Sequence, residues 1–332
     1  MTGCGQSGGS GQVANDKMPP LESVDTETSS GTNASTEKLN IVATTFPLYD
    51  WTRELLGEEA DRTDLTLLLN NNIDLHNYQP SVDDIVKITT CDLFIYVGGE
   101  SDEWVEDVLG NTTNEKMIVI NLMETLENAP GIDVRDQSHV HDGDEDEHGY
   151  DFDEHVWLSL KNANVYCPVI AEALSSLDPE NADVYRDNLK AYSEKLSVLD
   201  QEYQDVANVE QTKALIFGDR FPFSHLAEDY RLACYAAFDG CSAESEASFE
   251  TIMFLAEKVD ELGVEYIVVT ESSDQSIAKT IKNNTVAKNQ EILVMDSMQS
   301  MTMSDAEKGT TYISVMTDNL KTLTIALERN NG

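Results

Sequence analysis

The sequence has few basic residues for its length. Its 332 residues include 62 Asp and Glu against 21 Lys and Arg, which gives a formal net charge of −41 at pH 7. A chain this acidic repels nucleic acid phosphates and anionic lipids, so its natural partners are cations. Surface carboxylates also serve solubility alone, and the charge by itself therefore identifies no site.

Closely spaced cysteines and long apolar runs are absent too. The cysteines form no CxxC pair, so neither a zinc ribbon nor a disulfide-rich scaffold is indicated. No run of 18 apolar residues occurs, so we expect no membrane-spanning helix within these residues. The five cysteines are Cys4, Cys91, Cys167, Cys234 and Cys241.

Common catalytic motifs are also missing. The chain has no HExxH, no GxSxG and no glycine-rich phosphate loop. The segment HVHDGD departs from the HxHxDH pattern of metallo-hydrolases, because Gly143 and Asp144 replace its Asp and its third His. A surface metal-dependent hydrolase, with Glu244, Glu246 or Glu271 as general base, is the alternative function from another class.

The N-terminus indicates attachment to a membrane through a lipid. Met1-Thr2-Gly3-Cys4 has the small-small-Cys ending of a bacterial lipoprotein processing site, although the apolar segment that should precede it is missing. Residues 5–37 are rich in Gly, Ser, Thr and Asn. We therefore expect residues 1–38 to be a lipobox remnant and a flexible tether, with a reach of about 30 to 35 Å. A disordered leader with an incidental Cys4 is the alternative.

Short apolar runs alternate with longer amphipathic segments over the rest of the chain. Near-continuous apolar strands separated by helices indicate parallel sheets covered on both faces. We predict an α/β fold of two lobes, each with a roughly four-stranded, mainly parallel sheet flanked by helices. The expected strands are 39–45, 64–69, 92–98, 116–122, 213–219, 232–238, 264–271 and 291–297.

One long, rigid helix is predicted between the lobes, at residues 178–209. Its apolar residues recur at alternating steps of four and three, which places one apolar stripe on the helix. Asp178 suits the N-cap and Pro179 the first helical position, and a rod of roughly 43 Å can span both lobes. A coiled-coil segment for a partner helix is the alternative. We expect the N-terminal lobe to comprise residues 39–177, with an acidic His-rich loop at 136–154, and the C-terminal lobe to comprise residues 210–330.

Polar residues at strand ends are the candidates for a binding site, because ligands of open parallel sheets bind beyond the carboxyl ends of the strands. Asp219, Glu271 and Asp296 each close a predicted strand of the second lobe. In the first lobe, His76 lies in the loop after the second strand, and His155 leads directly into an apolar VWL segment. Two histidines from one lobe could therefore face two carboxylates from the other.

Such a set supplies two nitrogens and two or more anionic oxygens. This suits Zn²⁺, and also Mn²⁺ or Fe²⁺, and it disfavours Cu⁺, which prefers sulfur ligands. Binding would weaken as acid protonates the histidines. A loop His taken alone is equally well explained as a surface residue, and a strand-terminal Asp as a turn former, so the prediction depends on the constellation.

Several segments, in order, carry a family likeness: IVATTFPLYDW, IDLHNYQPSVDDI, DLFIYVGGESDEWVED, DEHVWLSLKNA, DPENADVYRDNLKAYSEKL, VTESS and VMDSM. With them the chain resembles the extracytoplasmic metal-binding receptors of bacterial ABC importers, the zinc and manganese solute-binding lipoproteins. The likeness covers residues 39 to about 330. It implies two α/β lobes joined by a rigid helix, a metal held in the cleft, and delivery to a membrane permease powered by a cytosolic ATPase.

The resemblance also implies a ligand set. His76 matches the first-loop His ligand, His155 the ligand of the Asp-x-His-x-Trp-Leu type segment, and Asp296 the late carboxylate after the last strand. The family usually places His or Glu in the turn where this chain has Gly-Asp-Arg, so Asp219 is expected there. His225, six residues on, is the competitor, and Glu271 is a further alternative or supporting residue.

The metal and the loop are interpreted together. Two carboxylates favour a harder ion such as Mn²⁺, whereas a long His-rich acidic loop is typical of the zinc receptors of this family, and on that basis we expect zinc. The loop is interpreted as a low-affinity collector of cations, with a merely solvated insertion as the alternative. Its histidines are His139, His141 and His148.

The expected function is therefore a monomeric binding protein without turnover of its own. It captures Zn²⁺ outside the bacterial cell membrane, to which a lipid on Cys4 anchors it, and delivers the ion to an ABC permease. A Mn²⁺ or Fe²⁺ receptor of the same type is the alternative within this class. Adhesion to host or neighbouring cells is a further interpretation that no sequence feature singles out.

Overall fold

The computed structural model describes residues 1, 3, 38–70, 75–129, 153–209, 214–239 and 247–328. The chain divides into two units, Met1–Glu37 and Lys38–Gly332, and the second contains the fold. Six residues with predicted roles lie outside the described residues, namely Cys4, His139, His141, His148, Glu244 and Glu246. Their predicted roles in lipidation, in cation collection and as general bases of the alternative hydrolase stay predictions.

The first lobe is built on a parallel sheet with strand order β2-β1-β3-β4. Its strands are β1 (Leu39–Ala43), β2 (Thr63–Leu67), β3 (Leu93–Tyr96) and β4 (Ile118–Asn121). Its helices are α1 (Phe46–Leu56), α2 (Val82–Thr90), α3 (Trp104–Leu109), α4 (Leu122–Glu127) and α5 (Leu160–Leu177). Short 3₁₀ turns lie between them at Gly57–Arg62, Leu75–Asn77, Glu100–Asp102 and Val156–Leu158.

The second lobe repeats this plan with strand order β6-β5-β7-β8, again parallel. Its strands are β5 (Ala214–Phe221), β6 (Ala233–Asp239), β7 (Tyr266–Thr270) and β8 (Glu291–Met295). Its helices are α7 (Ser224–Tyr230), α8 (Phe249–Leu262), α9 (Ser276–Asn284), α10 (Met303–Glu307) and α11 (Tyr312–Leu327). The predicted fold class is confirmed, and each expected strand is present.

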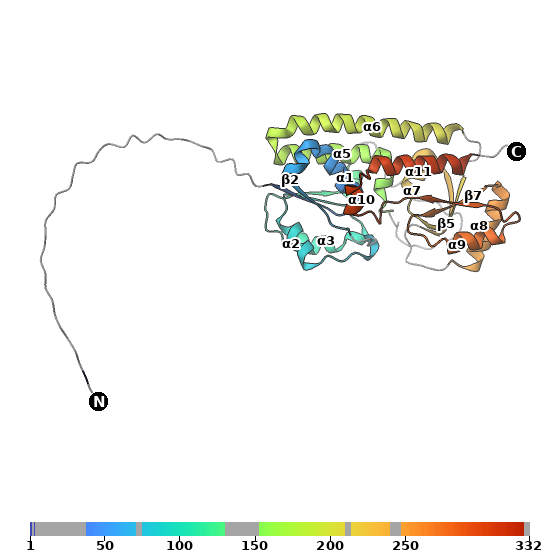
Figure 1. The fold of residues 1–332 in the computed structure, drawn as a ribbon, viewed down its shortest axis with the longest axis horizontal. Helices are drawn as coiled ribbons and strands as arrows, with labels where there is room; N and C mark the ends of the chain where they lie inside the picture. Colours follow the sequence, from blue (N-terminus) through green and yellow to red (C-terminus); the bar gives the residue numbers. More distant parts are fainter. Residues whose placement is uncertain are drawn as a thin grey trace. The chain divides into compact units, whose positions relative to one another are not determined.

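Helix α6 (Ala182–Val209) runs along both lobes (Figure 1). The amide of Asn188 donates to the carbonyl of Leu55 in α1, and the hydroxyl of Tyr203 donates to the carbonyl of Met316 in α11. The helix begins later than the predicted residue 178, at Ala182, because Pro179–Asn181 form a 3₁₀ turn. Asp178 makes no side-chain cap and accepts hydrogen bonds from Tyr185 and Asn181 instead.

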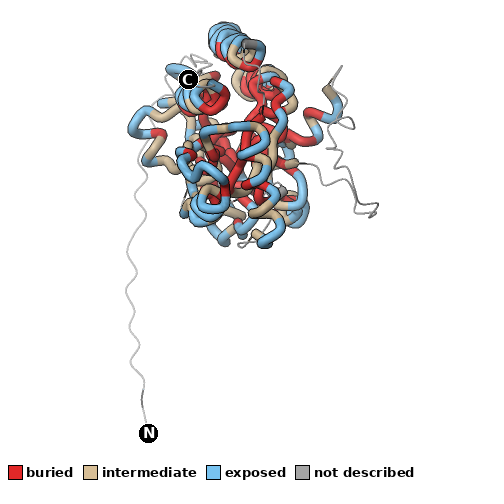
Figure 2. Tube along the Cα trace, turned by 90° about the vertical axis from the view of Figure 1, so that its right-hand side faces the viewer, coloured by how far each residue is buried: buried red, intermediate tan, exposed pale blue. Residues whose placement is uncertain are grey.

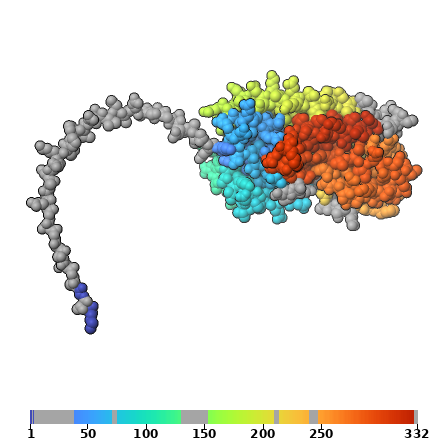
Figure 3. Space-filling model, in the orientation of Figure 1, coloured from blue at the N-terminus to red at the C-terminus, as the bar shows by residue number. Residues whose placement is uncertain are grey.

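The segment around α10 and the start of α11 returns to the first lobe, where it lies against the blue α1 region in Figures 1 and 3. The backbone N–H of Tyr312 donates to Asp50 at 2.7 Å, and the N–H of Met303 donates to Asn70 at 2.6 Å. The hydroxyl of Tyr312 donates to the carbonyl of Trp157 at 2.7 Å. The lobes are therefore joined by this segment as well as by α6.

Buried residues, red in Figure 2, follow the sheets and the helix faces packed on them. Trp51, Tyr166 and Tyr312 are fully buried and pack ring against ring at the junction of α1, α5 and α11. Cys91, Cys167 and Cys234 are free thiols. Among the described helices, none is long and apolar enough to cross a membrane.

Removal of the Tyr312 hydroxyl tests this junction. We expect Tyr312→Phe to lower the free energy of unfolding by about 1 to 3 kcal/mol, because the buried carbonyl of Trp157 would lose its donor. Urea unfolding followed by circular dichroism measures the change. Tyr266→Phe is the control, since that hydroxyl donates to no described residue, and a loss of similar size there would contradict the assignment.

Candidate metal centre

Two histidines from different loops of the first lobe meet at the centre of the site. The ring centroids of His76 and His155 lie 5.5 Å apart, and the ring planes are inclined by 54°. His76 lies in the 3₁₀ turn after β2, and a capping box formed by Ser81 and Asp84 starts α2 just beyond it. His155 is buried, whereas the side chain of His76 is 27% exposed. The His76 ring is therefore accessible to solvent, and the His155 ring is enclosed by protein.

The surroundings of His155 connect it to the second lobe. Its ring packs edge-on against Trp157, with centroids 5.1 Å apart. The indole N–H of Trp157 donates to the carbonyl of Ser297 at 2.9 Å, in the loop that follows β8. Ser297 is adjacent to Asp296. The contacts of Trp157 therefore bring the loop that carries Asp296 toward His155.

Asp153 holds the imidazole of His155. Its Oδ1 accepts the backbone N–H of His155 at 3.0 Å and lies 2.5 Å from Nδ1 of the same ring. Its Oδ2 accepts the hydroxyl of Ser224 in α7. Burial alone would raise the pKa of Asp153, but the charges and hydrogen bonds of His155 and the charge of His225 together hold that pKa below its usual value.

His225, the predicted competitor of Asp219, lies in α7 and is buried. Its Nε2 is 2.8 Å from the backbone carbonyl of Asp153, an oxygen that can only accept, so Nε2 carries the hydrogen and donates. A nitrogen that donates a hydrogen bond cannot also bind a metal. In this arrangement His225 holds the segment before His155.

Glu154 occupies the corresponding position near His76. Its Oε1 accepts the backbone N–H of Ser101 at 2.8 Å, and its Oε2 lies 3.7 Å from Nδ1 of His76. The hydroxyl of Ser101 lies 2.6 Å from the same nitrogen. Gly99, at φ +86°, makes room for the carboxylate, because a Cβ there would lie 2.4 Å from Oε1.

Asp219 lies within β5, two residues before its end, at an irregularity in the pairing of β5 with β6. The strand was predicted to end at Asp219 itself. The Asp219 carboxylate accepts the hydroxyl of Thr270 at 2.7 Å, at the end of β7. This bond fixes Asp219 at the carboxyl edge of the second sheet.

Asp296 and Glu271 follow β8 and β7 directly and lie near each other. Burial and the charge of Glu271 raise the pKa of Asp296 to about 7. Glu271 accepts hydrogen bonds from the backbone and hydroxyl of Ser297 and from the hydroxyl of Ser300. It therefore shapes the loop that carries Asp296, which fits a supporting role.

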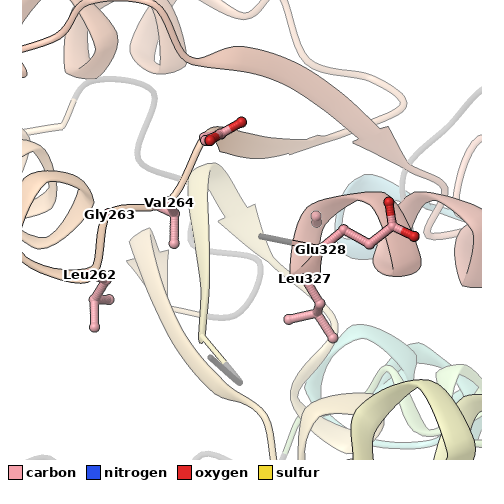
Figure 4. A pocket seen from close by; sticks show the side chains of 7 residues that line it. Leu262, Gly263, Val264, Leu327 and Glu328 are labelled. Atoms are coloured by element: carbon pink, nitrogen blue, oxygen red, sulfur yellow. The ribbon is translucent and has the colours of Figure 1, made fainter. Parts of the chain in front are cut away.

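The structure thus brings His76 and His155 together and leaves Asp219 and Asp296 in hydrogen bonds of their own. Among the described residues, no three His, Cys, Asp or Glu side chains converge closely enough to hold an ion. A pocket of about 10 Å³ between the ends of α8 and α11 has room for about one water and is lined by none of the predicted metal ligands (Figure 4). A larger hollow beside β4, α4 and α5 is also lined by other residues.

The sequence pattern does not predict Asp153, Glu154 or Ser101 at this site. It places Asp153 and Glu154 in the acidic loop, yet Glu154 is buried and the side chain of Asp153 is only 19% exposed. The available signal was their position directly before His155 and the apolar VWL segment. Ser101 carried no comparable signal.

Comparisons with known proteins identify the family of the chain. Residues 41–326 match the family described as zinc-uptake complex component A, periplasmic (ZnuA). The zinc-binding lipoprotein AdcA of Streptococcus pneumoniae is 32% identical over 286 residues, which are 86% of this chain and 55% of that protein. The high-affinity zinc uptake system protein ZnuA of Bacillus subtilis is 27% identical over 297 residues, 86% of this chain and 87% of that protein.

Solved structures show the same architecture. The Zn(II)-bound ZnuA-like domain of Streptococcus pneumoniae AdcA is 28% identical with a TM-score of 0.69, covering 88% of this chain and 100% of that one. The metal-dependent lipoprotein YcdH of Bacillus subtilis is 26% identical with a TM-score of 0.70, covering 87% and 99%. The chain spans about half the length of the AdcA proteins that it matches. It belongs to the family of zinc-uptake complex component A proteins.

Proposed function

We propose that this chain is an extracytoplasmic receptor that captures Zn²⁺ and delivers it to an ABC importer in the membrane. The observation that carries the proposal is the pair of imidazoles, 5.5 Å apart, whose neighbours reach both lobes. Imidazole nitrogen with carboxylate oxygen is a donor set that zinc accepts readily. Family membership and the zinc-binding relatives support the same ion.

The proposed ligands are His76, His155, Asp219 and Asp296. Binding would draw Asp219 from Thr270 and Asp296 from its present hydrogen bond, to the backbone N–H of Met298, toward the two imidazoles. Burial and the nearby charge of Glu271 raise the pKa of Asp296, and a cation bound by Asp296 would offset both effects. A closed shell of four protein ligands leaves no position for a reacting water, which is why a receptor is favoured over a hydrolase.

The proposed setting is the outer face of the bacterial cell membrane, with a lipid on Cys4 as the anchor. The AdcA relative of Streptococcus pneumoniae is a lipoprotein by name, which supports this location. The partner in this proposal is an ABC permease that accepts the ion from the receptor, and the receptor acts as a monomer.

Competition titrations test the ion. The metal-free protein is titrated against a chromophoric chelator with Zn²⁺, Mn²⁺ and Fe²⁺ in turn. We expect one tight zinc ion per chain and weaker binding of Mn²⁺ and Fe²⁺, because imidazole ligands and the Irving–Williams order both favour zinc over these ions. At a free zinc concentration 1,000 times the Kd, unfolding should cost about 4 kcal/mol more than in the metal-free protein. Tighter binding of Mn²⁺ would establish the alternative receptor, and no binding of any of these ions would refute the proposal.

A further inference from the structure

Two adjacent acidic residues, Asp153 and Glu154, each face the Nδ1 edge of a different histidine. Asp153 Oδ1 lies 2.5 Å from Nδ1 of His155, and Glu154 Oε2 lies 3.7 Å from Nδ1 of His76. We propose that Asp153 and Glu154 are positioning residues that keep both rings in the tautomer with hydrogen on Nδ1, so that Nε2 binds the metal. This inference rests on the proposed function and names residues that act through its ligands.

For His155 the assignment follows from the chemistry of the acceptor. An ionised carboxylate can only accept hydrogen bonds, so the short contact requires a hydrogen on Nδ1 of His155. The second oxygen of Asp153 is engaged by Ser224, and its backbone carbonyl by His225. These contacts hold the carboxylate from the second lobe while it holds the imidazole.

For His76 the assignment follows from the two groups at its Nδ1. The hydroxyl of Ser101 can donate or accept and so would suit either tautomer. Glu154 selects between them, because its carboxylate is stabilised by a nearby N–H and not by a nitrogen lone pair. Only 7% of the surface of Glu154 is exposed to solvent. The backbone N–H of Ser101 donates to its carboxylate and fixes the direction of that group.

The second oxygen of Glu154 is buried and makes no hydrogen bond to any described atom. A buried carboxylate oxygen without a donor is costly, by about 1 to 3 kcal/mol or more. A metal on Nε2 makes the Nδ1–H of the same ring a stronger donor, which would shorten the contact to Oε2 and offset this cost. Partner groups of this kind typically change metal affinity by about 10- to 100-fold.

Isosteric amides test the proposal. Asp153→Asn and Glu154→Gln remove the charge but keep the shape, and each should weaken Zn²⁺ binding about 10- to 100-fold. Glu100→Gln is the matched control, because Glu100 is exposed on the same loop as Ser101 and reports only the loss of one charge. Its affinity should stay within about twofold of that of the parent protein, and a loss equal to that of Glu154→Gln would overturn the proposal.

The ring tautomers give a readout that a merely structural role would not move. Imidazole ¹⁵N chemical shifts of the metal-free protein should show hydrogen on Nδ1 of both rings. Asp153→Asn should change the shifts of His155 and not those of His76, and Glu154→Gln should change those of His76 and not those of His155. Ser101→Ala should leave His76 with hydrogen on Nδ1, because Glu154 remains beside it.

The outcomes separate this inference from the proposed function. If the parent protein binds zinc and both amide variants keep its affinity within twofold, or if neither changes the shifts of its own histidine, the positioning role is wrong and the receptor function stands. If the parent protein binds no zinc, the proposed function itself fails. Because Glu154 is tested separately through His76, a failure of Asp153→Asn to fold would not shield the proposal.

Discussion

Substitution of His155 by Ala should lower the affinity for zinc by about 100- to 1,000-fold. Structural zinc sites with four protein ligands bind with about 10 to 16 kcal/mol, so one ligand contributes on the order of 2.5 to 4 kcal/mol. Each 1.4 kcal/mol is a tenfold change in Kd. His155 is buried beside Asp153 and Trp157, so a water that replaces the imidazole would have to enter an enclosed space. Competition titration at pH 7.5 measures the change.

His225→Ala is the matched control for this experiment, since both histidines are buried and both contact Asp153. We expect His225→Ala to weaken binding by less than about tenfold, because the Nε2 of His225 donates to the backbone carbonyl of Asp153 and so acts on the site through that residue. An equal loss in the two variants would make His225 a ligand in place of Asp219. Asp219→Ala decides between them, since unchanged affinity there would remove Asp219 from the site.

The strands of the fold were predictable because each is a short run of apolar residues with polar residues on both sides. Such a run is typical of a strand buried on both faces, as in a parallel sheet covered by helices, and β1 and β7 illustrate this. The end of β5 was less predictable. Its pairing shifts between Phe217 and Arg220, and a bulge leaves no mark in the hydrophobic pattern.

The site was predictable only in part. The proximity of His76 and His155 follows from the family resemblance and from the rule that ligands bind beyond the carboxyl ends of parallel strands. The roles of Asp153 and Glu154 do not, because in the sequence they continue an acidic run, and only folding shows that they turn inward. The contacts of Tyr312 with Asp50 and Trp157 join residues more than 150 positions apart, which no local pattern reveals.

A second large effect is expected in the pH dependence of stability. Burial raises the pKa of Asp50 to about 6, against the opposing effects of the Tyr312 N–H and Arg53. Burial likewise raises the pKa of Asp102 to about 6 and that of Asp296 to about 7. These carboxyl groups bind a proton more tightly in the folded chain than in the unfolded chain, where the ordinary pKa is near 3.9.

This difference in proton affinity sets the direction in which the free energy of unfolding changes with pH. Between about pH 4 and pH 7 the unfolded chain has already lost these protons while the folded chain retains them, so stability falls as pH rises. Lowering the pH of the metal-free protein from 7.5 to 5 should therefore raise the free energy of unfolding by on the order of 3 to 5 kcal/mol. The reduced net negative charge adds to the effect in the same direction. The pKa of Asp153 is shifted downward, and its contribution is lost only in stronger acid.

Urea unfolding in the presence of a chelator at pH 7.5, 6 and 5 measures the effect. Asp50→Asn removes one titrating group whose hydrogen bonds are to Arg53 and Tyr312, and it should reduce the gain between pH 7.5 and 5 by about 1 kcal/mol. Saturation with zinc should reverse the trend, because the ion keeps Asp296 ionised and acid protonates the histidines that hold it. A metal-free protein that loses stability between pH 7.5 and 5 would contradict the raised pKa values.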